Sequence, residues 1–262
     1  HWLNMKNLSN NQIYFLKKKY DIDGYIKIKN LLTKDEINEI KSSLFKFIEK
    51  KSKNFSGRDV SFVKNSKTIN SIHNLKKWGL IKKIQNNQKI KKLAKIMIGE
   101  KIKNFGAEIF AKPAKKGLQA PIHQDNHYWH VQTEKKNFYP NGLGLTIWIA
   151  LEESKKKNGA VFYFKKSHKV GLLEHVFLKK HSGLSQEIKY KNLLKLFKKK
   201  TPELNIGDAL IHNCMIIHGS NPNKSSQSRL GLTMRYVSKN SFINEYFKNK
   251  YDLELKKLKR IS

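Results

Sequence analysis

The hydrophobic positions of the chain change their spacing near residue 100. Before this point apolar residues recur every three or four positions, as they do along one face of a helix, whereas later they alternate or form short unbroken runs, as they do in strands. Helices therefore precede strands, and the two kinds of element do not alternate. This order argues against a doubly wound sheet and predicts a mainly β protein, a sandwich or jelly roll with helical additions.

The helices can be placed by their end signals. Ser9 is a good N-cap, Thr33 and Glu36 form a capping box, and Gly99 follows the last residue of an apolar-periodic segment. Helices are expected over four segments: Ser9–Tyr20, Thr33–Ile48, Ile90–Ile98 and Phe242–Leu258.

The strands can be placed by alternation and by apolar runs. The run 144–151 is too apolar to have a wet face and belongs in the core. Residues 172–200 form an insert rich in Lys and Leu, in which Tyr190–Lys199 is predicted to be helical. The expected strands are Tyr25–Ile28, Ile102–Lys112, Gly144–Leu151, Ala160–Phe164, Glu203–Ile206, Ala209–Ile217 and Arg229–Ser238.

The chain contains no internal repeat and no linker that would separate two domains. Its length is enough for one large domain with a well-buried core. We therefore expect a single domain over residues 1–262, with a helical part at 5–100, a jelly-roll core at 102–238 and a C-terminal helix at 242–258.

The formal net charge is +34, but its composition argues against sequence-specific binding of nucleic acid. Only four of the 54 basic residues are arginine, the side chain that usually recognises phosphates and bases with two hydrogen bonds. The lysines are spread along the whole chain and indicate a solvated surface. Weak attraction to anions is still expected.

The sequence also predicts the compartment. No run of 18 apolar residues occurs, so no membrane span is expected, and the N-terminal residues lack the pattern of a signal peptide. The single cysteine, Cys214, excludes an internal disulfide and a cysteine-based zinc site. A cytoplasmic location is therefore predicted.

The segment Ala120–His127 carries the candidate chemistry. His123 and Asp125 are two residues apart, so on a strand both side chains would point to the same face. One more histidine from a distant strand would complete a set of two histidines and one carboxylate. That set suits non-heme Fe(II), because it leaves positions open for a cosubstrate and O2.

Two later histidines can supply the third ligand. His218 lies where a strand gives way to a loop and is the better candidate, whereas His212 competes only if the barrel is deep, and otherwise ends the strand as a partly buried histidine. Arg229 follows His218 by eleven residues, and a hairpin would bring it back beside that histidine. An arginine there can hold a carboxylate with two hydrogen bonds, and Ser220 can add a hydroxyl.

Taken in order, several motifs of this chain resemble the phytanoyl-CoA dioxygenase family of Fe(II)- and 2-oxoglutarate-dependent oxygenases. The resemblance covers nearly the whole chain, and it depends on the order and spacing of the motifs more than on any one of them. They are Asp23-Gly24-Tyr25, Leu31-Leu32-Thr33, Lys112-Pro113, His123-Gln124-Asp125, the segments 148–152, 158–159 and 167–171, Gly207-Asp208-Ala209, the segment 218–223 and Arg229.

The resemblance implies a double-stranded β-helix, the jelly roll also found in cupins, and a set of roles. His123, Asp125 and His218 would bind iron and carry the catalysis. Arg229 would bind the far carboxylate of 2-oxoglutarate, with Ser220 nearby. Thr146 and Trp148 hold positions that contact this cosubstrate in some members, and core packing is the alternative role for both.

The implied reaction is hydroxylation of a small-molecule substrate with Fe(II), 2-oxoglutarate and O2, which releases succinate and CO2. Asp125 argues against halogenation, because related halogenases lack the carboxylate ligand. Two alternatives stay open: desaturation or epimerisation at the same iron, and a non-catalytic jelly-roll module that binds polyanions. Residues 126–130 can line the substrate side, and the loops 53–70 and 175–193 are the expected lids.

Overall fold

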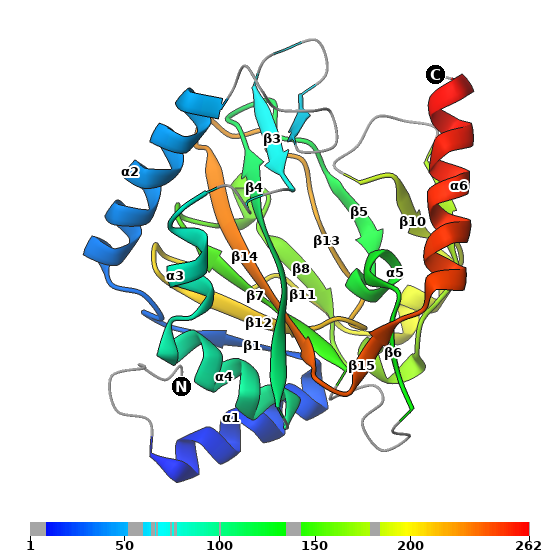
Figure 1. Ribbon diagram of the computed structural model, residues 1–262, viewed down its shortest axis with the longest axis horizontal. Helices are drawn as coiled ribbons and strands as arrows, with labels where there is room; N and C mark the ends of the chain where they lie inside the picture. The colour runs from blue at the N-terminus through cyan, green and yellow to red at the C-terminus, as the bar shows by residue number, and fades with distance from the viewer. Residues whose placement is uncertain are drawn as a thin grey trace.

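The computed structural model describes residues 9–261 apart from 52–59, 64, 65, 67, 74, 76, 77, 100, 135–142 and 179–183. Two antiparallel sheets form its centre (Figure 1). The larger has seven strands in the order β1 (Tyr25–Ile28), β12 (Ala209–Asn213), β7 (Gly144–Ala150), β14 (Arg229–Ser238), β4 (Ile102–Lys112), β3 (Ile69–Ile72) and β2 (Val60–Phe62). The smaller has four, in the order β11 (Lys199–Lys200), β8 (Val161–Phe164), β13 (His218–Ser220) and β5 (Ala120–His123).

The two sheets pack face to face. One hydrophobic cluster joins Trp148, Ala150 and Leu210 of the large sheet to Val161 and Tyr163 of the small one. This arrangement confirms the predicted jelly-roll architecture. Two short strand pairs lie beside it, β9 (His175–Phe177) with β10 (Gln186–Ile188) and β6 (Val131–Thr133) with β15 (Ser241–Ile243).

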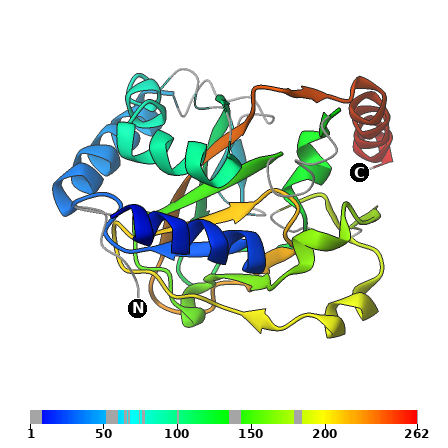
Figure 2. The same ribbon diagram turned by 90° about the horizontal axis from the view of Figure 1, so that it is seen from below.

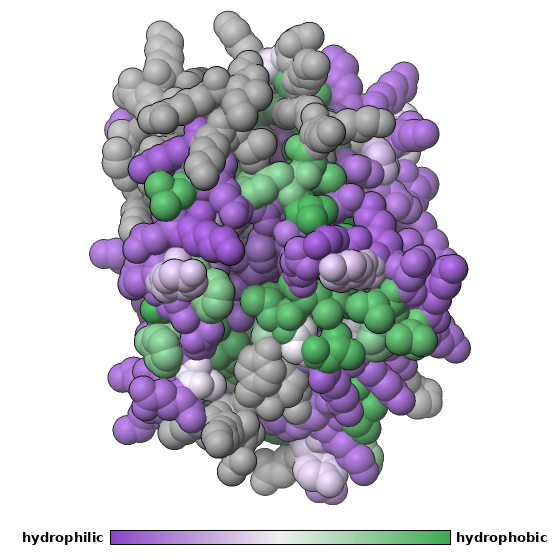
Figure 3. All heavy atoms as spheres, turned by 90° about the vertical axis from the view of Figure 1, so that its right-hand side faces the viewer, coloured by the Kyte–Doolittle hydropathy of each residue, from purple (hydrophilic) through white to green (hydrophobic). Residues whose placement is uncertain are grey.

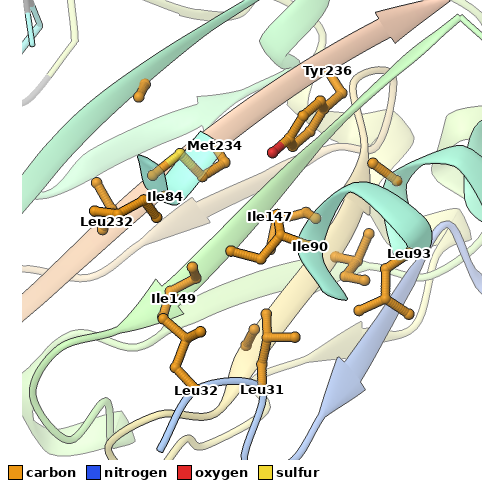
Figure 4. Packing of buried hydrophobic residues seen from close by; sticks show 14 of the residues in the cluster. Leu31, Leu32, Ile84, Ile90, Leu93, Ile147, Ile149, Leu232, Met234 and Tyr236 are labelled. Carbon is orange, nitrogen blue, oxygen red and sulfur yellow. The ribbon is translucent and has the colours of Figure 1, made fainter. Parts of the chain in front are cut away.

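Helices cover the outer face of the large sheet, as Figures 1 and 2 show. The large hydrophobic core lies between the sheet and these helices, with Ile90 and Leu93 packed near Ile147 and Tyr236 (Figure 4). The helices on this face are α1 (Asn10–Asp23), α2 (Lys34–Lys51), α3 (Ile81–Gln85) and α4 (Gln88–Ile98). The helices α5 (Asp125–Trp129) and α6 (Glu245–Ile261) lie away from it (Figure 1). The short 3₁₀ helices are η4 (Lys156–Asn158), η5 (Ser167–Val170) and η6 (Lys191–Leu196).

Strand β7 explains why the run 144–151 has no wet face. Leu145, Ile147 and Ile149 pack toward the helices, whereas Trp148 and Ala150 pack into the space between the sheets. Both faces of the strand are therefore covered, and every one of its residues is buried. The inward-facing positions of this strand are the ones available to a site inside the sandwich.

The three predicted cap signals are confirmed, whereas the C-terminal helix begins at Glu245 instead of Phe242, which lies in β15. Ser9 caps α1 with a reciprocal capping box to Gln12, and Thr33 and Glu36 exchange hydrogen bonds at the start of α2. Gly99 ends α4 in the left-handed conformation that favours glycine.

Three predicted elements differ from the structure. Glu203–Ile206 is not a strand: Leu204 makes a single bridge with Ser154. Ala209–Ile217 is not one strand, because β12 ends at Asn213 and β13 begins at His218. Tyr190–Lys199 forms the 3₁₀ helix η6 followed by the edge strand β11. Residues 209–217 are buried as their apolar pattern predicts, but the pattern did not show where the strand breaks. Tyr190, Leu193 and Leu196 are exposed, so the apolar residues of that segment did not report burial.

Two further observations concern the surface and the loops. Within the described residues, no helix combines the length and the apolar character needed to cross a membrane. Residues 53–59 of the first expected lid and 179–183 of the second lie outside the part of the chain that the structure describes.

Candidate active site

His123 and His218 face each other across two paired strands of the small sheet. They are register partners at the end of β5 and the start of β13, and their ring centroids lie 4.1 Å apart. Each Nδ1 is hydrogen-bonded to the carbonyl two residues earlier, at 2.7 Å to Pro121 and 3.0 Å to Ile216. Because a carbonyl only accepts, both Nδ1 atoms carry a proton, and in a neutral ring the Nε2 atom then presents a lone pair.

Asp125 lies in a different element from the two histidines, but its carboxylate is close to both of their Nε2 atoms. The prediction that it shares a strand with His123 is wrong, because β5 ends at His123 and Asp125 is the first residue of α5. The chain turns at Gln124, whose side-chain amide donates to the carbonyls of Gly171 and Met215 at 2.8 Å and 2.7 Å. The carboxylate nevertheless lies with Oδ1 at 3.6 Å from Nε2 of both His123 and His218.

These three side chains fit a divalent metal. Their ligand atoms lie within 4.8 Å of one another, and no other such group of His, Cys, Asp and Glu occurs in the described part of the chain. Burial and the neighbouring His123 hold the pKa of His218 well below its usual range, so this ring is neutral, the form that binds a metal. Two neutral imidazoles and one carboxylate form the set that Fe(II) oxygenases use.

The second oxygen of Asp125 is held by two side chains of the large sheet. Thr146 on β7 donates its hydroxyl to Oδ2 at 2.6 Å, and Nε2 of His212 on β12 lies 3.1 Å from the same oxygen. Nδ1 of His212 lies 3.0 Å from the hydroxyl of Tyr163 on β8. Burial alone would raise the pKa of Asp125, but the surrounding histidines hold it well below its usual range, and the carboxylate is ionised.

The sequence reasoning did not find the roles of His212 and Tyr163. It placed His212 at the far end of a strand shared with His218, but the two histidines lie in different sheets. The strand breaks at the buried Asn213, whose side chain accepts a hydrogen bond from Met215 N at 2.8 Å. A histidine inside the apolar run 209–213 was the available signal, since a buried imidazole needs polar partners.

Arg229 is buried at the start of β14. Its Nη1 donates to the carbonyl of Gly159 at 2.7 Å, and its guanidinium lies 5.0 Å from the ring centre of Trp148. Its Nε is buried and has no hydrogen-bond partner among the residues that the structure describes. Burial lowers its pKa to about 9, which leaves the side chain charged at neutral pH. No carboxylate of the described residues forms an ion pair with it, so an anionic ligand fits this place.

The predicted hairpin between His218 and Arg229 is wrong, because β13 and β14 belong to different sheets. The buried Asn223 fixes the crossing between them: its side-chain amide donates to the carbonyls of Lys112, Pro113 and Gln227. After the crossing, Arg229 begins β14 and is the backbone register partner of Lys112 on the antiparallel strand β4. The crossing, not a hairpin, brings the arginine to the inside of the sandwich.

The other residues expected at the cosubstrate are all buried in this region. Trp148 lies against Gly231, where an added Cβ would come within 2.0 Å of the indole ring. Ser220 lies on β13, two residues after His218. The hydroxyl of Thr146 donates a hydrogen bond to Asp125, so this side chain contacts a candidate iron ligand.

Residues 126–130 divide into packing and site-facing groups. Trp129 is buried in a cluster with Val131 and Leu143 and so belongs to the packing group. His127 stacks on His175 of β9, with ring centroids 3.9 Å apart, and its Nε2 is hydrogen-bonded to the side chain of Gln186.

Tyr251 of α6 covers this region. Its ring lies 5.9 Å, 6.0 Å and 5.4 Å from the rings of His127, Tyr128 and His130. Tyr128 also contacts the ring of His123 edge-on, at 5.8 Å. An uncharged wall of imidazole and phenol rings therefore extends from the candidate iron site to the C-terminal helix.

A double-stranded β-helix that holds two histidines, a carboxylate and a buried arginine with no ion-pair partner among the described residues has the architecture of the Fe(II)- and 2-oxoglutarate-dependent oxygenases. The family model "Phytanoyl-CoA dioxygenase (PhyH)" matches residues 20–231. The chain belongs to the phytanoyl-CoA dioxygenase family, which confirms the resemblance inferred from the motifs. The predicted cofactors, Fe(II), 2-oxoglutarate and O2, are those of this family.

Among characterised relatives, the chain is 24% identical to the peroxisomal phytanoyl-CoA dioxygenase of Homo sapiens over 247 residues, which covers 88% of this chain and 70% of the human protein. Among solved structures it is similar to EctD from S. alaskensis with 2-oxoglutarate and 5-hydroxyectoine, with a TM-score of 0.70 and 18% identity over 91% of this chain and 79% of that one. It is also similar to the epimerase SnoN in complex with Fe3+, alpha ketoglutarate and nogalamycin RO, with a TM-score of 0.68 and 16% identity over 89% and 86% of the two chains.

Proposed function

We propose that this protein is an Fe(II)- and 2-oxoglutarate-dependent dioxygenase that hydroxylates a small-molecule substrate and releases succinate and CO2. The observation that carries the proposal is the pairing of two features inside one sandwich. His123, Asp125 and His218 converge with their ligand atoms within 4.8 Å, and Arg229 is buried without a carboxylate partner among the described residues.

Each side chain has a separate task in this proposal. His123 and His218 offer neutral Nε2 atoms, and Asp125 offers the charge that balances part of the metal's. Arg229 grips the distal carboxylate of 2-oxoglutarate, with Trp148 below its guanidinium and Ser220 as a further donor. Bound Fe(II) would supply the activation of O2 that couples decarboxylation of the cosubstrate to oxidation of the substrate.

The wall formed by His127, Tyr128, His130 and Tyr251 is proposed as the substrate side. Burial lowers the pKa of His127 to about 4, so its ring is neutral at physiological pH. Such a wall excludes water, stacks on flat or apolar groups and offers few charges. It therefore suits a small organic substrate better than a polyanion.

A reaction other than hydroxylation at the same iron is the second candidate. SnoN is an epimerase and SnoK a carbocyclase, and both resemble this chain in fold. The ligand set alone does not separate these outcomes from hydroxylation. Mass spectrometry of the product does, because only hydroxylation adds one oxygen atom to the substrate.

The proposal is tested on the wild-type protein without knowledge of the substrate. Anaerobic titration of metal-free protein with Fe(II) and then 2-oxoglutarate should produce a weak visible charge-transfer band. Addition of O2 should then yield slow succinate formation, which a screen of candidate substrates should accelerate. Folded, metal-loaded protein that shows neither the band nor succinate would refute the assignment.

A comparison of wild type with the His123→Ala variant separates the enzyme from a polyanion-binding module. A binding module has no need of the triad or of Arg229, so its affinity for heparin would be equal in wild type and His123→Ala. The enzyme should lose the charge-transfer band and succinate formation in that variant, whatever the heparin affinity of its basic surface.

A further inference from the structure

The two oxygens of Asp125 lie in different surroundings. Oδ1 lies 3.6 Å from Nε2 of both His123 and His218, on the side where the ligand atoms converge. Oδ2 faces away and accepts from Thr146 at 2.6 Å, with His212 Nε2 at 3.1 Å. The site therefore distinguishes two chemically identical atoms.

The direction of each hydrogen bond around His212 follows from its partners. An ionised carboxylate only accepts, so Nε2 of His212 carries a proton and donates it to Oδ2. In a neutral ring Nδ1 is then an acceptor, and the hydroxyl of Tyr163, at 3.0 Å, is its donor. A phenol is protonated at neutral pH, so the hydroxyl has the proton that this bond needs.

Tyr163 is itself rigidly held. It is completely buried, it stacks on Tyr25 with ring centroids 4.4 Å apart and an angle of 12°, and it is the register partner of His218 on the neighbouring strand. Tyr163 belongs to the small sheet and His212 to the large one, so their hydrogen bond joins the two layers of the sandwich. Tyr163 therefore holds His212 in a fixed position relative to the neighbouring strand, which carries His218.

His212 does not compete as a metal ligand in this arrangement. Its Nε2 points a proton at Asp125, and its Nδ1 accepts from Tyr163, so neither nitrogen presents a lone pair to the point where the triad converges. The ring lies close to that of His218, with centroids 4.7 Å apart, yet it acts through the carboxylate.

We propose that His212, oriented by Tyr163, is a positioning residue that fixes the carboxylate of Asp125 so that Oδ1 alone faces the metal. The inference rests on the proposed iron site and goes beyond its ligands. Without His212 only the Thr146 hydroxyl holds Oδ2, and a single hydrogen bond leaves the carboxylate freer to rotate, so that Oδ2 can compete with Oδ1 for the metal. Partners of this kind typically change metal affinity by about 10–100-fold.

The test compares Co(II) binding to metal-free protein across four variants. His212→Leu removes both hydrogen bonds, His212→Gln keeps a donor near the place of Nε2, and Tyr163→Phe removes the hydroxyl but keeps the stacked ring. His168→Leu is the matched control, because His168 is also fully buried, but its Nε2 bonds to the backbone of Asp21. Calorimetry gives the affinity, visible absorption of Co(II) reports its coordination number, and melting curves of the metal-free proteins report stability.

The expected result is a loss of about 10–100-fold in Co(II) affinity for His212→Leu, with changed visible bands, and a smaller loss for Tyr163→Phe. His212→Gln should recover a large part of the affinity, and His168→Leu should melt earlier but bind Co(II) like wild type. The inference is overturned if His212→Leu binds like wild type, if Gln rescues no better than Leu, or if the control loses as much affinity.

The proposed function is judged separately, on the wild type alone. Succinate formation and a charge-transfer band in the wild type support the oxygenase whatever the variants do, and the variant ratios then decide the role of His212. A wild-type protein that binds neither Fe(II) nor Co(II) would overturn both.

Discussion

Single hydrogen bonds decide which atoms of this site are available for chemistry. The carbonyls of Pro121 and Ile216 accept hydrogen bonds from Nδ1 of His123 and His218, so the Nε2 atoms are left to act as ligands. Arg229 shows the opposite case, since its Nε is buried and has no hydrogen-bond partner in the described part of the chain. Because unpaired buried donors are costly, this residue is where a ligand contributes most.

Arg229→Ala is expected to weaken 2-oxoglutarate binding by about 2–5 kcal/mol, because a charge-assisted pair is lost and the ligand carboxylate is stranded in a mostly dry site. Arg229→Lys should recover only part of the affinity, since lysine keeps the charge but loses the two-pronged geometry. Calorimetry on Mn(II)-loaded protein measures the effect, and metal affinity should barely change. Unchanged cosubstrate affinity with a lower melting temperature in both variants would identify a structural arginine instead.

Gly231→Ala is expected to displace Trp148, because the new Cβ would lie within 2.0 Å of the indole ring. Overpacking of this kind costs about 1–3 kcal/mol of unfolding free energy, and the shifted ring should also weaken cosubstrate binding. Gly106→Ala on the neighbouring strand β4 is the control, since its Cβ meets its nearest atom, on Arg235, at 3.9 Å. Denaturant unfolding and calorimetry are the measurements, and equal effects of both substitutions would contradict the argument.

At the scale of elements, short segments of different sheets and helices meet at the mouth of the sandwich. The ring of His175 on β9 stacks on His127 of α5, its Nδ1 donates to Leu173 O at 2.9 Å, and its Nε2 accepts from Gln124 N at 3.2 Å. Both nitrogens are used in the neutral ring. Protonation of His175 would therefore break the contact between β9 and the turn that delivers Asp125.

This contact predicts a pH dependence of stability. Burial, with a contribution from His127, lowers the pKa of His175 from 6.5 to about 3. The folded pKa lies below the unfolded one, so the unfolded chain binds more protons and stability falls as the pH drops from 6.5 toward 3. At pH 5 the loss is about 1–2 kcal/mol. Melting temperatures measured between pH 7 and pH 5 should decline less steeply in His175→Gln than in wild type, and parallel declines would contradict the assignment.

At the scale of the whole molecule, the net charge of +34 is spread over a largely hydrophilic surface, of which Figure 3 shows one face. A hydrophobic band crosses this face between hydrophilic regions. The charges repel one another in the folded protein more than in the expanded unfolded chain, because they are closer together. Salt should therefore stabilise the fold.

Raising NaCl from about 0.01 M to about 0.1 M shortens the screening length from about 30 Å to about 10 Å. The melting temperature of the metal-free protein should rise over this range, and the same salt should weaken any binding to heparin. Calorimetry of unfolding at both salt concentrations provides the measurement. An unchanged or lower melting temperature would mean that charge repulsion does not limit the stability of this protein.

Much of the fold follows from local sequence. Caps at Ser9 and Thr33 set the starts of two helices, Gly99 sets the end of a third, and the alternation over Ile102–Lys112 and Arg229–Ser238 gives two strands whose bounds match the prediction. The residue types of the site were also accessible, because few chemistries need two histidines, a carboxylate and an arginine in that order.

The sequence by itself therefore determined the helices α1, α2, α4 and α6, the strands β1, β4, β7, β8 and β14, the family and the residues that converge on the candidate iron site. Only the tertiary structure decided that the run 209–217 splits between two sheets, that Asp125 leaves its strand, and that Tyr163 and His212 hold its second oxygen. The physical reason is that an apolar pattern reports burial but not which layer provides it. Hydrogen bonds between Tyr163 and His212, 49 residues apart, and between His212 and Asp125, 87 residues apart, leave no periodic signal in the chain, because their partners are chosen by the packing of two sheets.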